Sequence, residues 1–270
     1  MKPYDTLYIY EINGEIKGAK DRFHEDFLGC WLEGGYSYLF FSAKKEHELK
    51  GFALSTDEKY ISETVLDYED WEAADKIAPF KVGNLFICPV WDEYQARDDE
   101  VIIRLDPGVM FGSGYHPTTR KCIEALWRIY QWDSPKRVLD MGTGTGLLSI
   151  VAAKLGGKDI LALDNNNLAV ETCARNIALN DSENEIRVVH GDVLDYLKRE
   201  ADLLCANLHY DIIEKLVMND AFYTKKWYIL SGLLGTQVNK VLSILEGSSI
   251  DIIETVSDQS WFTLLGKRSI

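Results

Sequence analysis

The positions of apolar and polar residues divide the chain into an N-terminal part and a longer second part with a different pattern. The N-terminal part alternates aromatic and aliphatic runs, bounded by glycine or polar residues, with short polar stretches. This pattern predicts strands at 4–12, 36–41, 80–91 and 100–105, and short helices at 43–50 and 67–77. A small α+β unit is therefore expected here, with its boundary between residues 70 and 100.

In the second part, short apolar strands alternate with amphipathic helices. Helices are predicted at 117–131, 146–155, 167–180, 193–199, 210–217 and 236–246, and strands at 137–141, 159–163, 185–190, 202–206, 227–231, 249–257 and 260–267. Such alternation predicts a parallel sheet with helices on both faces. The last two strands have no helix between them, which predicts a β-hairpin at one sheet edge. The predicted fold class is α/β, a doubly wound Rossmann-like sheet with an edge hairpin, preceded by the small α+β domain.

Length and composition narrow the class of protein. A chain of 270 residues is long enough for about two domains. It has no apolar run of ~18 residues, so no membrane span is expected, and its first residues lack the apolar region of a signal peptide. The five cysteines are odd in number and form no CxxC pair, so neither a disulfide framework nor a metal site is expected. A reducing, cytoplasmic location is the corresponding prediction.

Charge is distributed unevenly along the chain. Residues 1–100 carry 11 Lys and Arg against 22 Asp and Glu, a net charge of −11, and the rest of the chain has the remaining −3 of a total of −14. Two interpretations remain open: a solvated acidic face that keeps the protein soluble, or a surface that docks a basic protein. Either one argues against nucleic acid as a direct partner, because its phosphates would be repelled.

A glycine-rich turn marks the predicted ligand site. Residues 137–148 read RVLDMGTGTGLL, so Gly142, Gly144 and Gly146 follow a strand and open a helix. A dinucleotide-binding turn needs its third glycine at Leu147, and the Lys-Ser/Thr ending of a P-loop is absent. With Asp140 two residues before the first glycine, the pattern is instead typical of S-adenosylmethionine-dependent methyltransferases. A turn that serves packing alone is the alternative.

Three polar residues follow the next predicted strands. Asp164, at the tip of the second strand, is placed to accept hydrogen bonds from both ribose hydroxyls of an adenosine. Asp192 follows the third strand, where it would either accept from an adenine amino group or cap the next helix. Asn207 follows the fourth strand, beside the reacting group of such a cofactor, unless it is only a buried turn residue.

The segment before the turn makes the pattern more specific. Residues 105–119 read LDPGVMFGSGYHPTT, which resembles the DPGxAFGTGxHxTT leader segment of the PrmA family. The segment 79–91 and the run Ser231-Gly232-Leu233-Leu234 also resemble that family, and the resemblance is weak over 1–70 and 208–226. PrmA enzymes methylate lysine and N-terminal amines of the eleventh protein of the large ribosomal subunit.

The resemblance implies an organisation and a set of site residues. Residues 1–70 would be a small, ferredoxin-like substrate-recognition domain, 71–104 a linker and 105–270 the S-adenosylmethionine-dependent methyltransferase domain. By position, the family's cofactor contacts fall on Thr119, Gly142, Asp164 and Asn207. Together with the residues predicted from the turn and the strand ends, the cofactor-binding residues would be Thr119, Asp140, Gly142, Gly144, Gly146, Asp164, Asp192 and Asn207. The leader segment would fold over the cofactor, with Phe111 and His116 bordering the site. The implied partner is a basic protein, most naturally a ribosomal protein.

The chain departs from the family pattern after the fourth strand. The family has Asn-Ile/Leu-Leu-Ala there, whereas this chain has Asn207-Leu208-His209-Tyr210. We expect Asn207, Leu208 and His209 to be the catalytic residues, with His209 and the ring of Tyr210 at the rim. Asn207 with Tyr210 also resembles the Asn-Pro-Pro-Tyr signature of enzymes that methylate amide or base nitrogens, but both prolines are missing. A small-molecule amine as substrate, or a non-catalytic binding module, are further alternatives.

Overall fold

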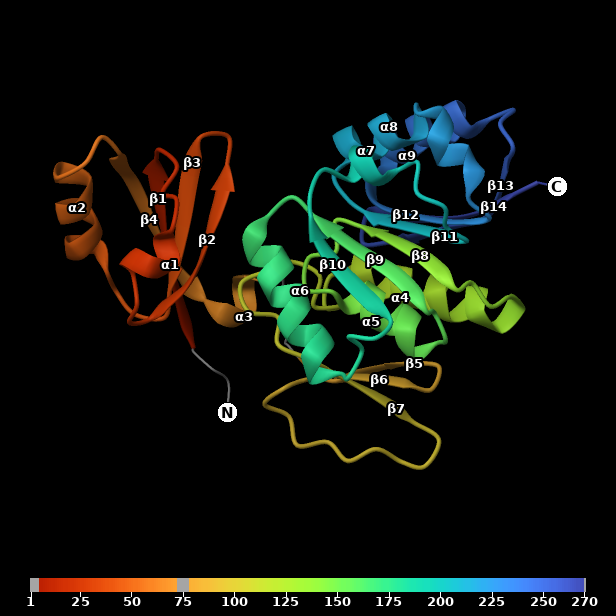
Figure 1. Cartoon of the computed structure of the whole chain (residues 1–270), viewed down its shortest axis with the longest axis horizontal. Helices are drawn as coiled ribbons and strands as arrows, with labels where there is room; N and C mark the ends of the chain where they lie inside the picture. The colour runs from red at the N-terminus through yellow and green to blue at the C-terminus, as the bar shows by residue number, and fades with distance from the viewer. Residues whose placement is uncertain (1–4, 72–77, 270) are drawn as a thin grey trace.

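The computed structural model describes residues 5–71 and 78–269, in which an N-terminal unit lies beside a larger α/β body (Figure 1). Residue 4 of the first predicted strand and residues 72–77 of the predicted helix 67–77 lie outside the described residues. No helix among the described residues has the length and apolar character needed to cross a membrane.

The N-terminal unit is a four-stranded antiparallel sheet with two helices. Its elements are β1 (Thr6–Asn13), α1 (Ala19–Arg22), β2 (Phe27–Glu33), β3 (Tyr36–Phe41), α2 (Glu46–Leu54) and β4 (Lys59–Asp67), followed by α3 (Tyr68–Trp71). The sheet order is β2-β3-β1-β4, which with the chain order β-α-β-β-α-β is the split β-α-β arrangement. β2 and β4, both edge strands, were not predicted from the sequence. β4 is rich in exposed polar residues, and β2 contains a glycine and ends in exposed residues.

The two faces of this sheet have different partners, because side chains alternate between faces along a strand. One face packs aromatic and aliphatic residues such as Tyr10 and Phe41 against α1 and α2. The other face buries residues such as Phe40 against Met110 and Leu168 of the α/β body. The contact is close: a Cβ atom at Gly29 would lie 2.6 Å from the Leu168 side chain.

Residues 80–105, which include most of the predicted linker, form a small sheet of their own. It contains β5 (Phe80–Val82), β6 (Leu85–Pro89) and β7 (Val101–Leu105), in the order β5-β6-β7. The prediction of one strand over 80–91 is wrong, because the chain turns at Gly83. That residue has φ +57°, and a Cβ there would lie 1.9 Å from Trp127 Nε1. The sheet shares a hydrophobic core with the helix that contains Trp127.

The larger body confirms the predicted α/β class. Its elements are α4 (Pro117–Trp132), β8 (Arg137–Met141), α5 (Leu147–Lys154), β9 (Asp159–Asp164), α6 (Asn167–Leu179), β10 (Ile186–His190), α7 (Val193–Tyr196), β11 (Leu203–Asn207), α8 (Tyr210–Val217), the 3-10 helix η1 (Asp220–Thr224), β12 (Trp227–Leu234), α9 (Gly235–Leu245), β13 (Ile250–Asp258) and β14 (Trp261–Arg268). The seven-stranded sheet has the order β10-β9-β8-β11-β12-β14-β13. The hairpin of β13 and β14 forms one edge as predicted, with β14 inserted antiparallel beside β12.

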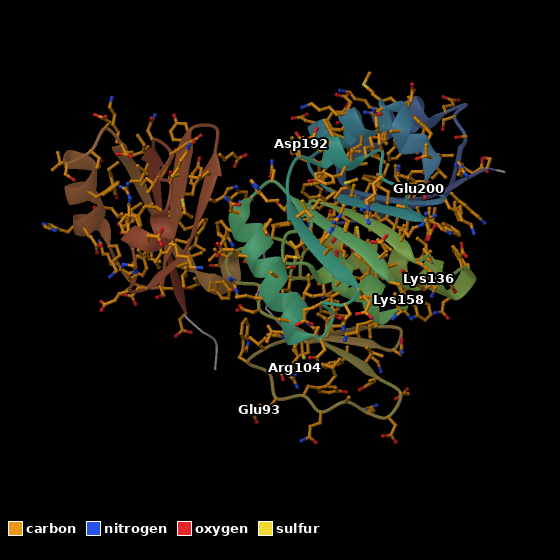
Figure 2. The ribbon with its side chains drawn as sticks, in the orientation of Figure 1. Glu93, Arg104, Lys136, Lys158, Asp192 and Glu200 are labelled. Carbon is orange, nitrogen blue, oxygen red and sulfur yellow. The ribbon has the colours of Figure 1, made fainter. Side chains whose placement is uncertain are left out.

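Helices cover both faces of this sheet. Helices α4, α5 and α6 share one core cluster with every second strand residue, and α7, α8 and α9 share the other. The carboxyl ends of β8 to β11 therefore meet at one edge, where parallel α/β sheets bind ligands. Asp192 lies at that end of the sheet, whereas Lys136 and Lys158 precede β8 and β9 at the opposite end (Figure 2).

Two asparagines, Asn176 on α6 and Asn180 at its C-terminal cap, join β7 and the start of the leader segment to this helix. Asn176 Oδ1 accepts from the Asp106 backbone N–H at 2.8 Å, and its Nδ2 donates to the carbonyl oxygens of Asp106 and Thr145 at 2.9 and 2.8 Å. One helical turn later, Asn180 makes the same pair of bonds to the backbone of Arg104. The two side-chain amides therefore bond the backbone groups of Arg104 and Asp106 as a neighbouring strand would. Asn176 also joins this segment to the glycine turn through the Thr145 carbonyl oxygen.

We expect Asn176→Leu to lower the free energy of unfolding by about 2–4 kcal/mol, since each buried backbone group left without a partner costs ~1–3 kcal/mol. Urea denaturation followed by circular dichroism measures this change. Ala174→Leu, an exposed change on the same helix, is the control and should alter the free energy by less than about 0.5 kcal/mol. Equal stability of the two variants would show that the amide bonds do not hold the leader.

Candidate functional site

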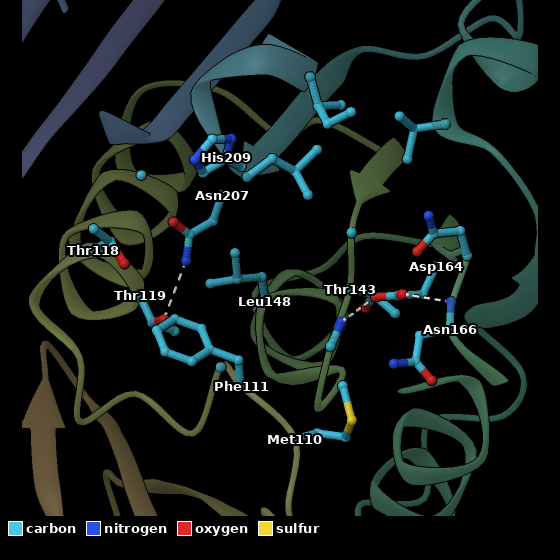
Figure 3. A pocket seen from close by; sticks show the side chains of 18 of the residues that line it. Met110, Phe111, Thr118, Thr119, Thr143, Leu148, Asp164, Asn166, Asn207 and His209 are labelled. Atoms are coloured by element: carbon cyan, nitrogen blue, oxygen red, sulfur yellow. Dashed lines mark hydrogen bonds between the residues drawn. The ribbon is translucent and has the colours of Figure 1, made fainter. Parts of the chain in front are cut away.

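A cavity of about 720 Å³ opens at the carboxyl ends of the central strands. Its lining comes from the leader segment, from the loops after β8, β9, β10 and β11, from the start of β14, and from β2 of the N-terminal unit. Figure 3 shows Asp164 and Thr143 on one side of this space, and Asn207, Thr119 and Phe111 on the other. The volume is within the usual range for a small-molecule site.

The glycine turn forms the floor between these two sides. Gly142, Gly144 and Gly146 all have positive φ, at +75°, +54° and +86°. A Cβ at Gly142 would lie 2.1 Å from a Leu208 methyl carbon, and one at Gly144 would lie 2.4 Å from the Phe111 carbonyl oxygen. Both backbone conformation and space therefore require glycine here. Gly142 and Gly144 line the cavity, whereas Gly146 is not among the lining residues and contacts Cys173 instead.

Asp164 is held at the tip of β9 by the backbone. Its Oδ2 accepts from the Gly144 N–H and its Oδ1 accepts from the Asn166 N–H, both at 3.0 Å (Figure 3). Each carboxylate oxygen keeps a further acceptor position. Burial raises the pKa of this carboxyl above its ordinary value, although these backbone donors lower it. Asn166 is the N-cap of α6, because its side chain accepts from the Leu168 N–H.

Asp140 lies beneath the turn and is not among the residues that line the cavity. It is 1% exposed, and its Oδ2 accepts from the hydroxyls of Thr143 and Ser149, both at 2.7 Å. Burial raises the pKa of this carboxyl. Its Oδ1 is buried and accepts no hydrogen bond from a described residue. The visible contacts of Asp140 therefore tie the turn to the first turn of α5.

Asp192, Asn207 and Thr119 all line the cavity. Asp192 caps α7, because its side chain accepts from the Leu194 N–H at 2.9 Å. Asn207 Nδ2 donates to Thr119 Oγ1 at 3.2 Å, which joins the end of β11 to the first turn of α4 (Figure 3). This bond orients the amide, so that Asn207 Oδ1 is left as the acceptor.

Aromatic rings form the wall near Asn207. The rings of Phe111 and His116 lie 5.1 Å apart, and those of His116 and Trp261 lie 5.2 Å apart. His116 lines the cavity, and it also caps α4 by accepting from the Thr118 N–H. Burial lowers the pKa of His116. A neutral ring at physiological pH is the consequence.

The segment after Asn207 agrees only in part with the expectation. Leu208 and His209 line the cavity, and the His209 side chain is 74% exposed with Nδ1 3.3 Å from Asp211 Oδ2. The prediction that Tyr210 brings its ring to the rim is wrong. Tyr210 is only 7% exposed, packs in the core below α8 and donates its hydroxyl to Glu214, because position 210 begins the buried face of an amphipathic helix.

Several lining residues were not identified from the sequence, among them Trp31, Glu33 and Trp261, which lie far in the chain from the predicted site motifs. Trp31 and Glu33 lie on the unpredicted strand β2, so no pattern placed them near the glycine turn. Trp261 follows the turn between β13 and β14, where Gln259 and Ser260 have positive φ at +51° and +93°. Positive φ at both central residues is the geometry of a two-residue type I′ hairpin turn, and Gln-Ser is not one of the residue pairs that announce such a turn in a sequence.

Comparison with known proteins agrees with this geometry. Residues 39–269 match the family model described as Ribosomal protein L11 methyltransferase (PrmA). The enzyme named ribosomal protein L11 methyltransferase from Exiguobacterium sibiricum is 37% identical over 226 residues, 82% of this chain and 71% of the relative. The one from Clostridium perfringens is 32% identical over 269 residues, 98% of this chain and 83% of the relative.

Solved structures are also similar to this chain, one of them in both sequence and fold and another in fold alone. The crystal structure of the ribosomal protein L11 methylase from Lactobacillus delbrueckii subsp. bulgaricus is 30% identical and has a TM-score of 0.64, covering 71% of this chain and 99% of that chain. A putative RNA methyltransferase from Pyrococcus horikoshii is 17% identical, with a TM-score of 0.50 over 58% of this chain and 87% of that one. The latter likeness shows the fold alone. On the extent of the family match and the identity of its relatives, the chain belongs to the PrmA family of ribosomal protein L11 methyltransferases.

Proposed function

We propose that this chain transfers methyl groups from S-adenosylmethionine to amino nitrogens of ribosomal protein L11, either lysine side chains or the N-terminal amine. One observation carries the proposal. In a chain of the PrmA family, a single cavity joins the glycine turn and Asp164 on one side to the bonded pair Asn207 and Thr119 on the other. The side with Asp164 suits the adenosine of the cofactor, and the side with Asn207 and Thr119 suits the methyl group and the amine that receives it.

The residues present fit the cofactor. Asp164 presents two carboxylate oxygens whose remaining acceptor positions suit a pair of ribose hydroxyls. Gly142 and Gly144 line the cavity, so a ligand can approach the backbone of the turn there. Asp192 would accept from the adenine amino group, and Thr119 and Asn207 would contact the cofactor near its sulfur. Asp140 and Gly146 would support the turn from below.

S-adenosylmethionine supplies an activated methyl group on a sulfonium, so the protein mainly binds and orients its substrates. Asn207 Oδ1 is an acceptor of fixed direction, since its amide is oriented by Thr119. This oxygen would accept an N–H of the incoming amine and direct the nitrogen lone pair toward the methyl group. The Leu208 carbonyl is a second candidate acceptor beside it.

The amine must lose a proton before it can attack. A lysine amine has a pKa of ~10.4 and an N-terminal amine one of ~7.7–8.0. Apolar side chains line this part of the cavity, including Phe111, Leu148 and Leu208, and desolvation by such groups favours the neutral amine. His209 is mostly exposed at the rim, so it would pass the proton directly to solvent.

The N-terminal unit would recognise the protein substrate. Its acidic composition suits a basic partner, and its sheet packs beside the mouth of the cavity. We propose the division made from sequence, with residues 1–70 as the recognition domain and 105–270 as the methyltransferase domain. The intervening segment carries β5 to β7. A base or amide nitrogen as methyl acceptor is not favoured, because the relatives are named ribosomal protein L11 methyltransferases.

The test is a labelled methyl transfer assay. Purified protein is incubated with labelled S-adenosylmethionine and undermethylated ribosomal proteins, and the products are identified by mass spectrometry. Label on lysine or N-terminal amines of L11 supports the proposal. Label only on RNA, or on other proteins, contradicts it.

We expect Asp164→Ala to weaken S-adenosylmethionine binding about 10–100-fold, because charge-assisted hydrogen bonds are lost. Isothermal titration measures the affinity. Asp195→Ala removes an exposed acid on α7 that does not line the cavity, and it should bind as the wild type does. If Asp164→Ala melts normally and binds with unchanged affinity, the ribose assignment is wrong.

Nicotinamide dinucleotides should give no measurable binding. Leu147 occupies the position where their turn needs glycine, and it is buried at 1% exposure in the core below α5. Thermal-shift titrations with NAD and with S-adenosylmethionine compare the two ligands in one experiment. A larger shift with NAD would overturn the cofactor assignment.

Neutralising acids of the N-terminal unit should weaken recognition of the protein substrate. Asp67 and Asp70 are exposed and described, so the double variant Asp67→Asn, Asp70→Asn should raise the KM for L11 and reduce its dependence on salt. Affinity for S-adenosylmethionine should stay the same. Measurements across ~0.05–0.5 M salt cover the range in which surface charges become screened. Identical KM values and salt slopes would leave the acidity as a solubility feature.

A further inference from the structure

The N-terminal unit contributes two side chains to the cavity, Trp31 and Glu33. They are two residues apart on β2 and therefore lie on the same face of the sheet. Gly29, two residues earlier, contacts Leu168 of α6 so closely that a Cβ would lie 2.6 Å from it. Trp31 packs in the cluster that contains Leu168 and Met110. The Gly29 contact thus places the end of β2 over the mouth of the cavity.

The charges along the cavity single out Glu33. Its described lining contains three carboxylates, Glu33, Asp164 and Asp192, and neither lysine nor arginine. Asp164 accepts two backbone N–H bonds, and Asp192 caps α7. Glu33 is exposed and forms no ion pair with a described residue. Among the three lining carboxylates, Glu33 is therefore the one whose charge is not already engaged by a described residue.

We propose that Glu33, together with the indole of Trp31, receives the ammonium form of the acceptor amine at the mouth of the cavity and delivers it toward Asn207. This inference rests on the proposed function. The amine arrives as a cation, since a lysine has a pKa of ~10.4, and the cofactor sulfonium also carries a positive charge. A carboxylate at the mouth offsets this repulsion, and an indole binds cations through its π face.

Glu33 acts here as a positioning residue and not as the base. A glutamate has a pKa of ~4.3, far below that of the amine, so it binds the ammonium without removing its proton. The proton leaves to solvent when the amine moves on to the apolar part of the cavity beside Phe111 and Leu208. The charge of Glu33 should therefore affect KM for the protein substrate much more than kcat.

The test compares Glu33→Gln with the matched control Glu25→Gln in the full chain. Glu25 is an exposed acid of the same unit that does not line the cavity, so both variants lose one charge. Glu33→Gln should raise the KM for L11 about 3–10-fold, as for a partly exposed charge contact. Glu25→Gln should change KM less than twofold, and the S-adenosylmethionine affinity of both should equal that of the wild type.

The pH dependence separates charge recognition from a structural effect. At an N-terminal amine, whose pKa is ~7.7–8.0, the KM difference between the two variants should disappear between about pH 7 and pH 9 as the acceptor loses its charge. At a lysine it should persist over that range. Mass spectrometry assigns the rates to each site. The trend at an N-terminal amine is the one that decides, and where only lysines are methylated the comparison of Glu33→Gln with Glu25→Gln decides instead.

The outcomes are distinguishable from those of the proposed function. If the wild type methylates no amine of L11, the proposed function itself fails, and with it this assignment. If the wild type is active but Glu33→Gln and Glu25→Gln have the same KM, the Glu33 assignment alone is overturned. A KM difference of constant size at an N-terminal amine from pH 7 to pH 9 would also overturn it, because only a structural change lacks that titration.

Discussion

The turn after β8 has no room for a side chain, and the rest of the site is built around that constraint. An ideal Cβ at Gly144 would lie 2.4 Å from the Phe111 carbonyl oxygen, and one at Gly142 would lie 2.1 Å from the Leu208 side chain. The leader segment, the turn and the end of β11 are therefore packed directly on one another. The same closeness lets the turn donate its Gly144 N–H to Asp164. A side chain in this turn would separate the leader from β9 and β11 together.

Hydrogen bonds from polar side chains also join the elements around the cavity to one another. Asn176 bonds the leader to α6 and to the turn, and the Asn207–Thr119 bond joins β11 to α4. These residues are far apart in the sequence, yet each bond has defined direction and partners. The cavity is thus preorganised on the side formed by the glycine turn and the end of β11. On its open side it is completed by β2, a strand of the other unit, through the contact between Gly29 and Leu168.

Much of the fold and of the cavity wall around the glycine turn follows from local sequence. Alternating strands and helices predicted the parallel sheet, and residues at strand ends, such as Asp164 and Asn207, line the cavity where β-α units bring such ends together. The leader resemblance identified Thr119, which local pattern would have treated as an ordinary helix residue. In contrast, Asp140 has the position of a site residue in the sequence, but its contacts lie under the turn.

What the sequence did not predict depends on packing between distant elements. Strands β2 and β4 are edge strands with weak alternation, so Trp31 and Glu33 gave no local signal. Tyr210 follows a motif position, but the apolar face of α8 turns its ring into the core. Trp261 reaches the cavity only because β14 is inserted beside β12. To predict any of these positions, one would have to know how elements that are distant in the chain pack on one another.

A crystal structure of the chain with S-adenosylhomocysteine tests the central claim most directly. The account predicts that the ribose hydroxyls lie within hydrogen-bond distance of Asp164, and that the sulfur lies on the Asn207 and Thr119 side with the Trp31 and Glu33 side open to the acceptor. A ligand bound outside this cavity, or one with its adenosine beside Asn207 and its sulfur beside Asp164, would contradict the account.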